Sequence, residues 1–171
     1  MILYPKLYIE NVLKIDENII KQYKIKALLL DIDNTLIHYD KTILDGVEKW
    51  AEKMKENGIK LCILSNSNNN EKIESVASKI CIPYIGFANK PLKKGFKKAI
   101  KLLNINPENI AMVGDQIFTD VIGANRMKMV SILTKPLEEK DIWVTKIKRP
   151  IENAVINKYL KKKGDNKNVL K

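Results

Sequence analysis

The sequence predicts an α/β fold of three layers, in which helices cover both faces of a mainly parallel central sheet. Two observations predict it: five short apolar runs recur along the chain, and amphipathic helical patterns separate them. Continuous apolar runs suit strands that are buried on both faces of a parallel sheet. The alternation of strand and helix favours right-handed crossover units. At 171 residues, with 45% hydrophobic and 30% charged residues, the chain can bury one core of ordinary size.

Each predicted strand is an apolar run that ends in polar or turn-forming residues. The runs consist mostly of Ile, Leu, Val, Ala and Met, and each is shorter than a typical helix. In chain order the predicted strands are residues 25–31, 59–65, 82–87, 109–115 and 129–133.

Each predicted helix has apolar residues three or four positions apart, which places them on one face toward the sheet. Gly58 suits the end of the first of these helices, because glycine readily adopts the left-handed conformation found there. Pro91 suits the first turn of the third. In chain order the predicted helices are residues 45–57, 70–80, 91–103 and 117–127, and an amphipathic helix over 151–160 follows them.

We expect one domain over residues 1–150 without a large cap domain, followed over 151–171 by the amphipathic helix and a basic tail. A flap at 36–43 and one helix occupy the first long connection between motif residues, and one helix and one strand occupy the next. Neither connection has room for an inserted lid, so we expect an open site unless a second subunit, in a homo-oligomer, supplies the lid. The last helix could dock on the body or lie on a membrane surface.

The net charge of +11 is concentrated partly in the tail, because the last fourteen residues contain six Lys and one Asp. Such a tail could attract an anionic membrane, or could serve only solubility. Aromatic residues do not interleave with a basic stripe, which disfavours nucleic-acid binding. No apolar run reaches the roughly 18 residues of a membrane span, and no signal peptide is evident. Two cysteines do not make a disulfide framework. We therefore expect a cytoplasmic protein, peripheral at the membrane if the tail binds there.

Polar residues cluster where the predicted strands end. Asp31 and Asp33 end the first run, Ser65 and Asn66 follow the second, and Asp115 ends the fourth. Open α/β sheets bind ligands at the carboxyl edge of their strands. Converging carboxylates repel by roughly 4 kcal/mol at about 4 Å and an effective dielectric near 20, so they require a cation.

The donors in this cluster are oxygen atoms without His or Cys, which favours Mg²⁺ over zinc. Lys90, which follows the third run, adds a positive charge beside the expected metal site. A metal-bound phosphoryl group next to a carboxylate invites nucleophilic attack through an aspartyl-phosphate.

The stretches DIDNTL, SN, KP and GDQIFTD resemble, in order and spacing, the four motifs of the haloacid dehalogenase-like (HAD) phosphohydrolase superfamily. More closely, the chain resembles the YqeG-like IIIA branch, which includes phosphatidylglycerophosphate phosphatases. That likeness lies in the segments ANKP at 88–91, GDQIFTDVIGANRMKM at 114–129, TKIKRPIE at 145–152, and the N-terminal PKLYIENVLKI. The resemblance implies a Rossmann-like HAD fold and a Mg²⁺-dependent phosphatase acting on phosphatidylglycerophosphate or another large, exposed phosphate.

The resemblance also implies catalytic roles. Asp31 would take the phosphoryl group as nucleophile, and Asp33 would protonate the leaving alcohol and then activate water. Lys90 would neutralise charge on the nucleophile and the phosphate. The residues implied to bind phosphate or to fix the loop that binds it are Thr35, Ser65, Asn66 and Lys90.

The implied metal ligands are the carboxylates of Asp31 and Asp115 and the backbone carbonyl of Asp33. Asp120 would either reach the metal through water or orient Lys90. A plainer interpretation of Asp120 is an acidic residue favoured by a helix dipole.

Other interpretations remain open at this stage. Ser65 and Asn66 could simply cap the next helix, and His38, in the flap, is expected to be exposed. The enzyme could instead act on soluble sugar or nucleotide phosphates, or on phosphorylated protein or nucleic acid. A non-catalytic phosphate-binding module is disfavoured, because it would be expected to lack one of the motif residues.

Overall fold

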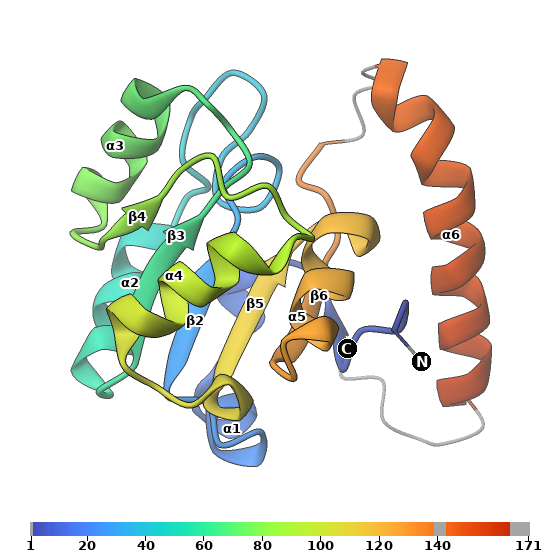
Figure 1. The fold of residues 1–171 in the computed structure, drawn as a ribbon, viewed down its shortest axis with the longest axis horizontal. Helices are drawn as coiled ribbons and strands as arrows, with labels where there is room; N and C mark the ends of the chain where they lie inside the picture. Colours follow the sequence, from blue (N-terminus) through green and yellow to red (C-terminus); the bar gives the residue numbers. More distant parts are fainter. Residues whose placement is uncertain (1, 139–142, 165–171) are drawn as a thin grey trace.

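The computed structural model describes residues 2–138 and 143–164, and its centre is a six-stranded sheet (Figure 1). The strand order is β1–β6–β5–β2–β3–β4, and every neighbouring pair is parallel. The predicted α/β fold with a parallel sheet is confirmed. The strands are β1 (Leu7–Ile9), β2 (Ala27–Leu30), β3 (Lys60–Leu64), β4 (Tyr84–Ile85), β5 (Ile110–Gly114) and β6 (Val130–Thr134).

The four predicted helices of the body are present, with corrections at their ends. Pro91 lies outside its helix, which begins at Lys93, so the predicted first-turn position is wrong. The segment predicted as one helix over 117–127 is a π-helical stretch, η3, followed by the short α5. The helices are η1 (Val12–Lys14), α1 (Glu17–Gln22), α2 (Val47–Glu56), α3 (Asn70–Lys79), α4 (Lys93–Leu103), η2 (Pro107–Asn109), η3 (Ile117–Val121), α5 (Ile122–Arg126) and α6 (Trp143–Gly164).

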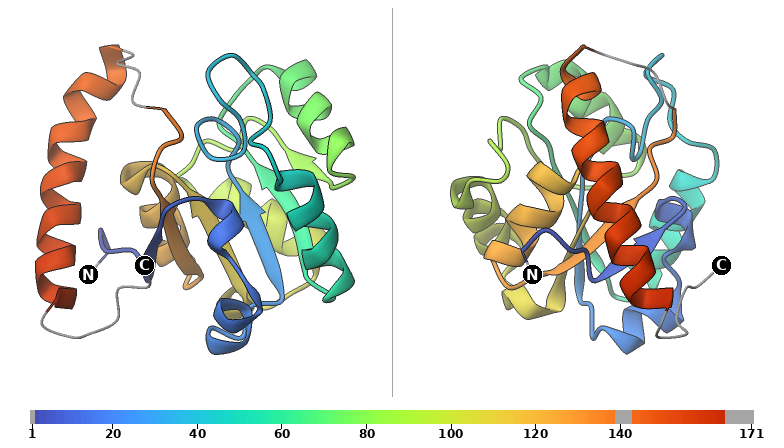
Figure 2. Two further views of the ribbon diagram at one scale, coloured as in Figure 1. Left: turned by 180° about the vertical axis from the view of Figure 1, so that it is seen from behind. Right: turned by 90° about the vertical axis from the view of Figure 1, so that its right-hand side faces the viewer.

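Alternate residues of the central strands face opposite layers of the fold. In β2, Leu28 and Leu30 pack in the cluster that contains residues of α1, α2 and α3. Ala27 and Leu29 pack in a second cluster with residues of α4 and α5. The views in Figures 1 and 2 show α4 and α5 on one face of the sheet and α1 and α2 on the other. Because all four residues of β2 are buried, the apolar run of the sequence is the centre of the core.

Local signals explain where two of the helices end or begin. Gly58 follows α2 with a φ of +75°, the left-handed conformation expected of it. The Asn69 side chain accepts a hydrogen bond of 3.0 Å from the backbone N–H of Lys72 and so caps α3. The cap of α3 is therefore Asn69, and neither Ser65 nor Asn66 fills that position.

The C-terminal helix α6 docks against the edge of the sheet formed by β1 and β6. Val155 and Ile156 pack against Ile117, Val121 and Leu133. The predicted helix over 151–160 is part of this longer helix, and its apolar face meets the body. Figure 2 shows that α6 lies beside β1 and β6. None of the helices in the described ranges is both long enough and apolar enough to cross a bilayer.

The order of the strands determines which chain segments meet at the carboxyl edge. β2 lies between β5 and β3, so the chain moves outward to β4 and then returns across β2 to β5. Leu30 pairs with Ile63 on one side and with Val113 on the other. The residues that follow these three strands therefore meet at a topological switch point, where open α/β sheets bind their ligands.

Candidate active site

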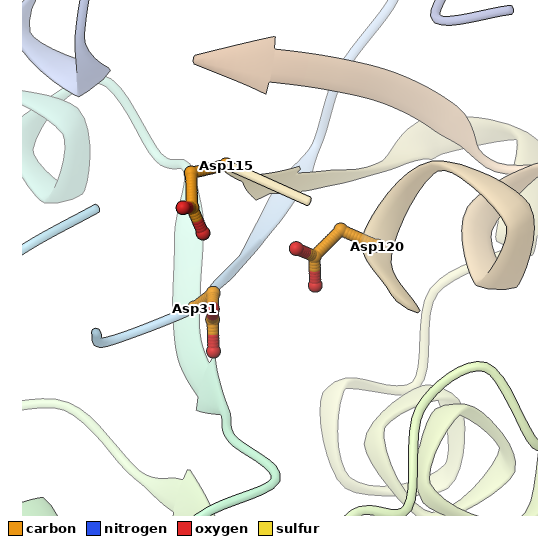
Figure 3. Close-up of side chains that lie close together, drawn as sticks. All are labelled: Asp31, Asp115 and Asp120. Carbon is orange, nitrogen blue, oxygen red and sulfur yellow. The ribbon is translucent and has the colours of Figure 1, made fainter. Parts of the chain in front are cut away.

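Three carboxylates converge at the switch point. Asp31 follows β2, Asp115 follows β5, and Asp120 comes from η3; one oxygen of each lies within 4.8 Å of one oxygen of the others. Figure 3 shows the three side chains gathered around a common space. The structure thus brings together three of the residues that the sequence analysis assigned to a metal site.

Lys90 is buried among these carboxylates. Its Nζ lies 2.7 Å from Asp31 Oδ1 and 2.8 Å from Asp120 Oδ1, and its side chain is only 1% exposed. A buried charge is tolerated when it is paired, because unpaired charges lose their hydration without compensation. The contact with Asp120 matches the alternative in which Asp120 orients Lys90.

Burial and mutual repulsion disturb the ionisation of the cluster. Burial, partly offset by Lys90, raises the pKa of Asp31 to about 6. Burial and then the charges of Asp31 and Asp120 raise the pKa of Asp115 well above its ordinary value. Burial alone would lower the pKa of Lys90, but the carboxylates of Asp120 and Asp31 outweigh it and raise this pKa. Asp31 and Asp115 therefore resist ionisation, because full ionisation would place more negative charge here than Lys90 can neutralise.

The cluster fits a divalent cation. If all three carboxyl groups ionise, they and the one ammonium group leave two negative charges in a buried space, which a divalent cation would offset. Asp115 Oδ1 is also buried, and it has no hydrogen-bond partner among the residues that the structure describes. An orphaned carboxylate oxygen beside two others is the donor set that hard cations such as Mg²⁺ bind. The carboxylate of Asp33 lies outside this set, as expected if only its backbone carbonyl contacts the metal.

Asn66 holds the backbone of Lys90 in place. The Asn66 side chain accepts a hydrogen bond of 2.6 Å from the backbone N–H of Lys90 and donates one of 3.0 Å to the carbonyl of Lys90. This side chain is thus committed to Lys90, and the predicted contact of Asn66 with phosphate stays a prediction. Ser65 is buried, and its hydroxyl accepts from the backbone N–H of Ser67 at 3.1 Å, which shapes the same loop.

Asp33 lies at the rim of the site and contacts a lysine that sequence reasoning missed. Lys72 Nζ, from the first turn of α3, lies 2.7 Å and 2.8 Å from the two carboxylate oxygens of Asp33. The side chain of Asp33 is 53% exposed, whereas that of Lys72 is 15% exposed. The periodicity of α3 indicates only that Lys72 lies off its buried face, so no signal in the sequence marks this contact.

The loop after Asp33 is tied to the segment that follows β6. The Asn34 side chain donates to the carbonyl of Glu138 at 3.1 Å and accepts from its backbone N–H at 3.0 Å. In the flap, His38 Nδ1 lies 3.0 Å from Glu138 Oε1 and its side chain is 30% exposed. The expectation that His38 is simply exposed is wrong, because this pairing partly buries it. Thr35 is buried and its hydroxyl has no partner in the described part of the chain, so its assigned role stays a prediction.

The segment that carries Asp120 is held from two sides. At Gly114, a Cβ would overlap the carboxylate of Asp120, so this glycine allows the close approach. At the start of η3, Glu152 Oε1 of α6 accepts the backbone N–H groups of Ile117 at 2.9 Å and Phe118 at 3.3 Å. π-helical segments frequently occur at functional sites. Glu152 was missed, although a carboxylate on the apolar face of the last helix was a signal.

Comparison with known proteins places this arrangement in a family. The family model described as haloacid dehalogenase-like hydrolase matches residues 39–128. The probable phosphatase YqeG of Bacillus subtilis (strain 168) is 34% identical over 161 residues, covering 94% of this chain and 92% of that protein. Phosphatidylglycerophosphate phosphatase 1 (chloroplastic/mitochondrial) of Arabidopsis thaliana is 24% identical over 168 residues, covering 92% of this chain and 48% of that protein.

A solved structure supports the fold independently. The cobalt-bound deoxy-D-mannose-octulosonate 8-phosphate phosphatase of Haemophilus influenzae has a TM-score of 0.55 at 14% identity, over 81% of this chain and 91% of that chain. The fold and the site define a phosphatase that acts on phosphate monoesters. The chain belongs to the haloacid dehalogenase-like hydrolase family, and within it is similar to the probable phosphatase YqeG.

Proposed function

We propose that this phosphatase works through an aspartyl-phosphate on Asp31, depends on Mg²⁺, and acts on a lipid phosphate such as phosphatidylglycerophosphate. The convergence of Asp31, Asp115 and Asp120 around Lys90 carries the mechanistic part of the proposal. Asp31 and Asp115, with the backbone carbonyl of Asp33, would hold Mg²⁺, which would bind a phosphoryl oxygen and offset its charge.

In the first step, a carboxylate oxygen of Asp31 attacks the phosphorus and the bond to the leaving oxygen breaks. Asp33 gives its proton to that oxygen, so the alcohol leaves in neutral form. Lys90, already in contact with Asp31, offsets the negative charge that gathers on the phosphoryl group.

In the second step, water attacks the phosphorus of the aspartyl-phosphate. Asp33, now a carboxylate, takes a proton from this water, and the bond between Asp31 and phosphorus breaks to release phosphate. The exposed position of Asp33 at the rim suits both steps, because the leaving alcohol and the entering water reach the site from that side.

The lipid substrate is supported by two observations. The Arabidopsis relative is named as a phosphatidylglycerophosphate phosphatase. Neither of these two connections carries an inserted lid, because only the flap and α2 separate β2 from β3, and only α3, β4 and a loop separate β3 from α4. An uncovered site admits a phosphate that projects from a large body.

The test is release of phosphate from a panel of monoesters with Mg²⁺, including a lipid phosphate and soluble sugar, nucleotide and peptide phosphates. We expect Asp31→Asn to lower turnover by at least about a thousandfold, because it removes the nucleophile. Asp45→Asn makes the same chemical change at an exposed residue outside the site and should leave turnover unchanged. Full activity of Asp31→Asn would refute the mechanism, and preference for a soluble monoester would refute the lipid substrate.

A further inference from the structure

One segment of the chain beside the site carries lysines without any acidic residue. Residues 75–107 contain seven lysines and no acidic residue, and they include β4, α4 and the loop between them. Because Phe96, Ala99 and Leu103 are buried in the core, the lysines of α4 lie on its outer side. The exposed lysines of this helix are Lys93, Lys94, Lys97, Lys98 and Lys101.

Two large apolar side chains are exposed at the end of this surface nearest the site. Phe87 is 65% exposed and Leu92 is 57% exposed. They flank Lys90, whose Nζ contacts Asp31. The apolar pair is therefore next to the phosphate-transfer site, and the lysines continue from it along α4.

Phe87 is also in an unfavourable backbone conformation. Its φ is +51°, in the left-handed region that bulky side chains rarely adopt. Its backbone N–H donates to the carbonyl of Ser67 at 3.0 Å, and that of Ala88 donates to the carbonyl of Ser65 at 2.9 Å. The left-handed backbone conformation and the exposure of the phenyl ring to water are both unfavourable for folding. This combination points to a role in binding and not in stabilising the fold.

The first turn of α4 is packed directly on this loop. At Gly95, a Cβ would overlap the carbonyl oxygen of Ala88, so only a glycine allows this approach. The start of α4 is therefore in close contact with the backbone of Ala88, which lies between Phe87 and Lys90 in the chain. A partner that binds the outer side of α4 would therefore be held at a constant distance from the candidate active site.

We propose that this surface, which we call the α4 face (Phe87, Leu92 and the five exposed lysines of α4), docks on an anionic lipid bilayer. The proposal rests on the lipid substrate proposed above and deepens it by naming the surface that meets the membrane. Lysines attract anionic headgroups, and exposed aromatic and aliphatic side chains enter the interface between headgroups and acyl chains. Nucleic acid fits less well, because Phe96, the one aromatic residue among the lysines of α4, is buried and Leu92 offers no stacking surface.

The test is co-sedimentation of the full chain with vesicles, without substrate. One set of vesicles contains phosphatidylcholine with phosphatidylglycerol and the other contains phosphatidylcholine alone. We expect binding to the anionic vesicles only. A triple variant, Lys94→Gln, Lys97→Gln and Lys98→Gln, should bind on the order of a hundredfold more weakly, because each lysine near an anionic surface contributes about a fivefold change.

A matched variant on the other basic helix provides the control. Lys158, Lys161 and Lys162 are exposed on α6, and changing all three to Gln removes the same charge. If the α4 face is the docking surface, the α6 variant should keep most of its binding to anionic vesicles. A second variant, Phe87→Asn with Leu92→Asn, should weaken binding while retaining the lysines, since Asn tolerates the left-handed conformation.

The outcomes separate this proposal from the proposed function. Turnover of a soluble monoester should be unchanged in all three variants, which shows that fold and site are intact. Failure of the wild type to bind anionic vesicles, loss of binding only in the α6 variant, or binding of an oligonucleotide in place of vesicles would overturn the docking surface. None of these results would affect turnover that depends on Asp31, so the mechanism is tested separately.

Discussion

Lys72 holds Asp33 by both carboxylate oxygens, at 2.7 Å and 2.8 Å, although the two residues lie on different elements at the rim of the site. A general acid must point at the leaving oxygen, and a carboxylate on an exposed loop has several rotamers to choose from. Lys72 restricts that choice, so in the proposed mechanism we expect it to position Asp33.

We therefore expect Lys72→Met to lower kcat by about tenfold with little change in KM, because loss of acid–base catalysis costs roughly 10²–10⁴ in full. Lys72→Arg should retain most of the activity. In an Asp33→Asn background, Lys72→Met should cause no further loss, and an equal loss there would show that Lys72 acts elsewhere. Lys79→Met, at an exposed position on the same helix, is the control in steady-state assays.

Lys90 is expected to stabilise the fold as well as the reaction. Lys90→Met removes the ammonium group that contacts Asp31 and Asp120, and leaves two buried carboxylates facing each other. Breaking a buried ion pair from one side typically costs about 3–5 kcal/mol. Urea denaturation without metal should show a loss of this size, whereas Lys93→Met, at an exposed position of α4, should change stability little. A loss below about 1 kcal/mol for Lys90→Met would contradict the pairing.

The raised pKa of Asp31 predicts how stability depends on pH when metal is absent. The pKa of Asp31 is about 6 in the folded state and 3.8, its ordinary value, in the unfolded state. Between these values the folded state binds more protons, so stability falls as pH rises. The favourable contribution is complete below pH 3.8 and is lost as pH rises through about 6. In total this difference amounts to about 3 kcal/mol, at about 1.4 kcal/mol per unit.

The measurement is urea denaturation at several values between pH 4 and pH 7 in EDTA. Asp31→Asn should make the fall across this range shallower without abolishing it, because the raised pKa of Asp115 also contributes. Mg²⁺ should stabilise the wild type most at pH 7, because it favours the ionised carboxylates. A metal-free profile that rises steadily from pH 4 to pH 7 would show that Asp31 is not buried as described.

Glu152 should link the C-terminal helix to η3, the segment that carries Asp120. Glu152→Ala leaves the backbone N–H groups of Ile117 and Phe118 without this acceptor, at a cost of about 1–3 kcal/mol. We expect lower stability and a higher Mg²⁺ concentration for half-maximal activity, because η3 carries Asp120. Glu152→Gln keeps an oxygen acceptor and should lose less. Asn153→Ala, at the neighbouring exposed position, is the control. If it lowers stability and raises the Mg²⁺ requirement equally, the effect comes from any change in this part of α6 and not from the Glu152 carboxylate.

Much of the fold and the centre of the site could be predicted from local sequence. The run before Asp31 is fully buried in β2, and runs of this kind predicted five of the six strands. The strand β1 was missed because only Leu7 and Ile9 are buried in its three residues, a pattern too short to distinguish. Asp31 and Asp115 end predicted strands and Lys90 follows one, and the strands of a parallel sheet end at one edge.

The contacts that complete the site could not be predicted in the same way. Lys72 and Asp33 are 39 residues apart, and Glu152 and Ile117 are 35 apart. Each pair meets only because the two elements that carry its residues pack at a particular distance and orientation relative to each other. Periodicity shows which face of a helix is buried, but carries no information on the partner that the other face meets.

The chain by itself determined the alternation of buried strands and amphipathic helices, and the acidic residues at the strand ends, because both depend on spacing along the backbone. The packed fold decided which charges pair, which carboxylate oxygen of Asp115 stays without a partner in the described residues, and where α6 contacts η3. Those contacts depend on distances between segments that are remote in sequence, and such distances exist only once the core has formed.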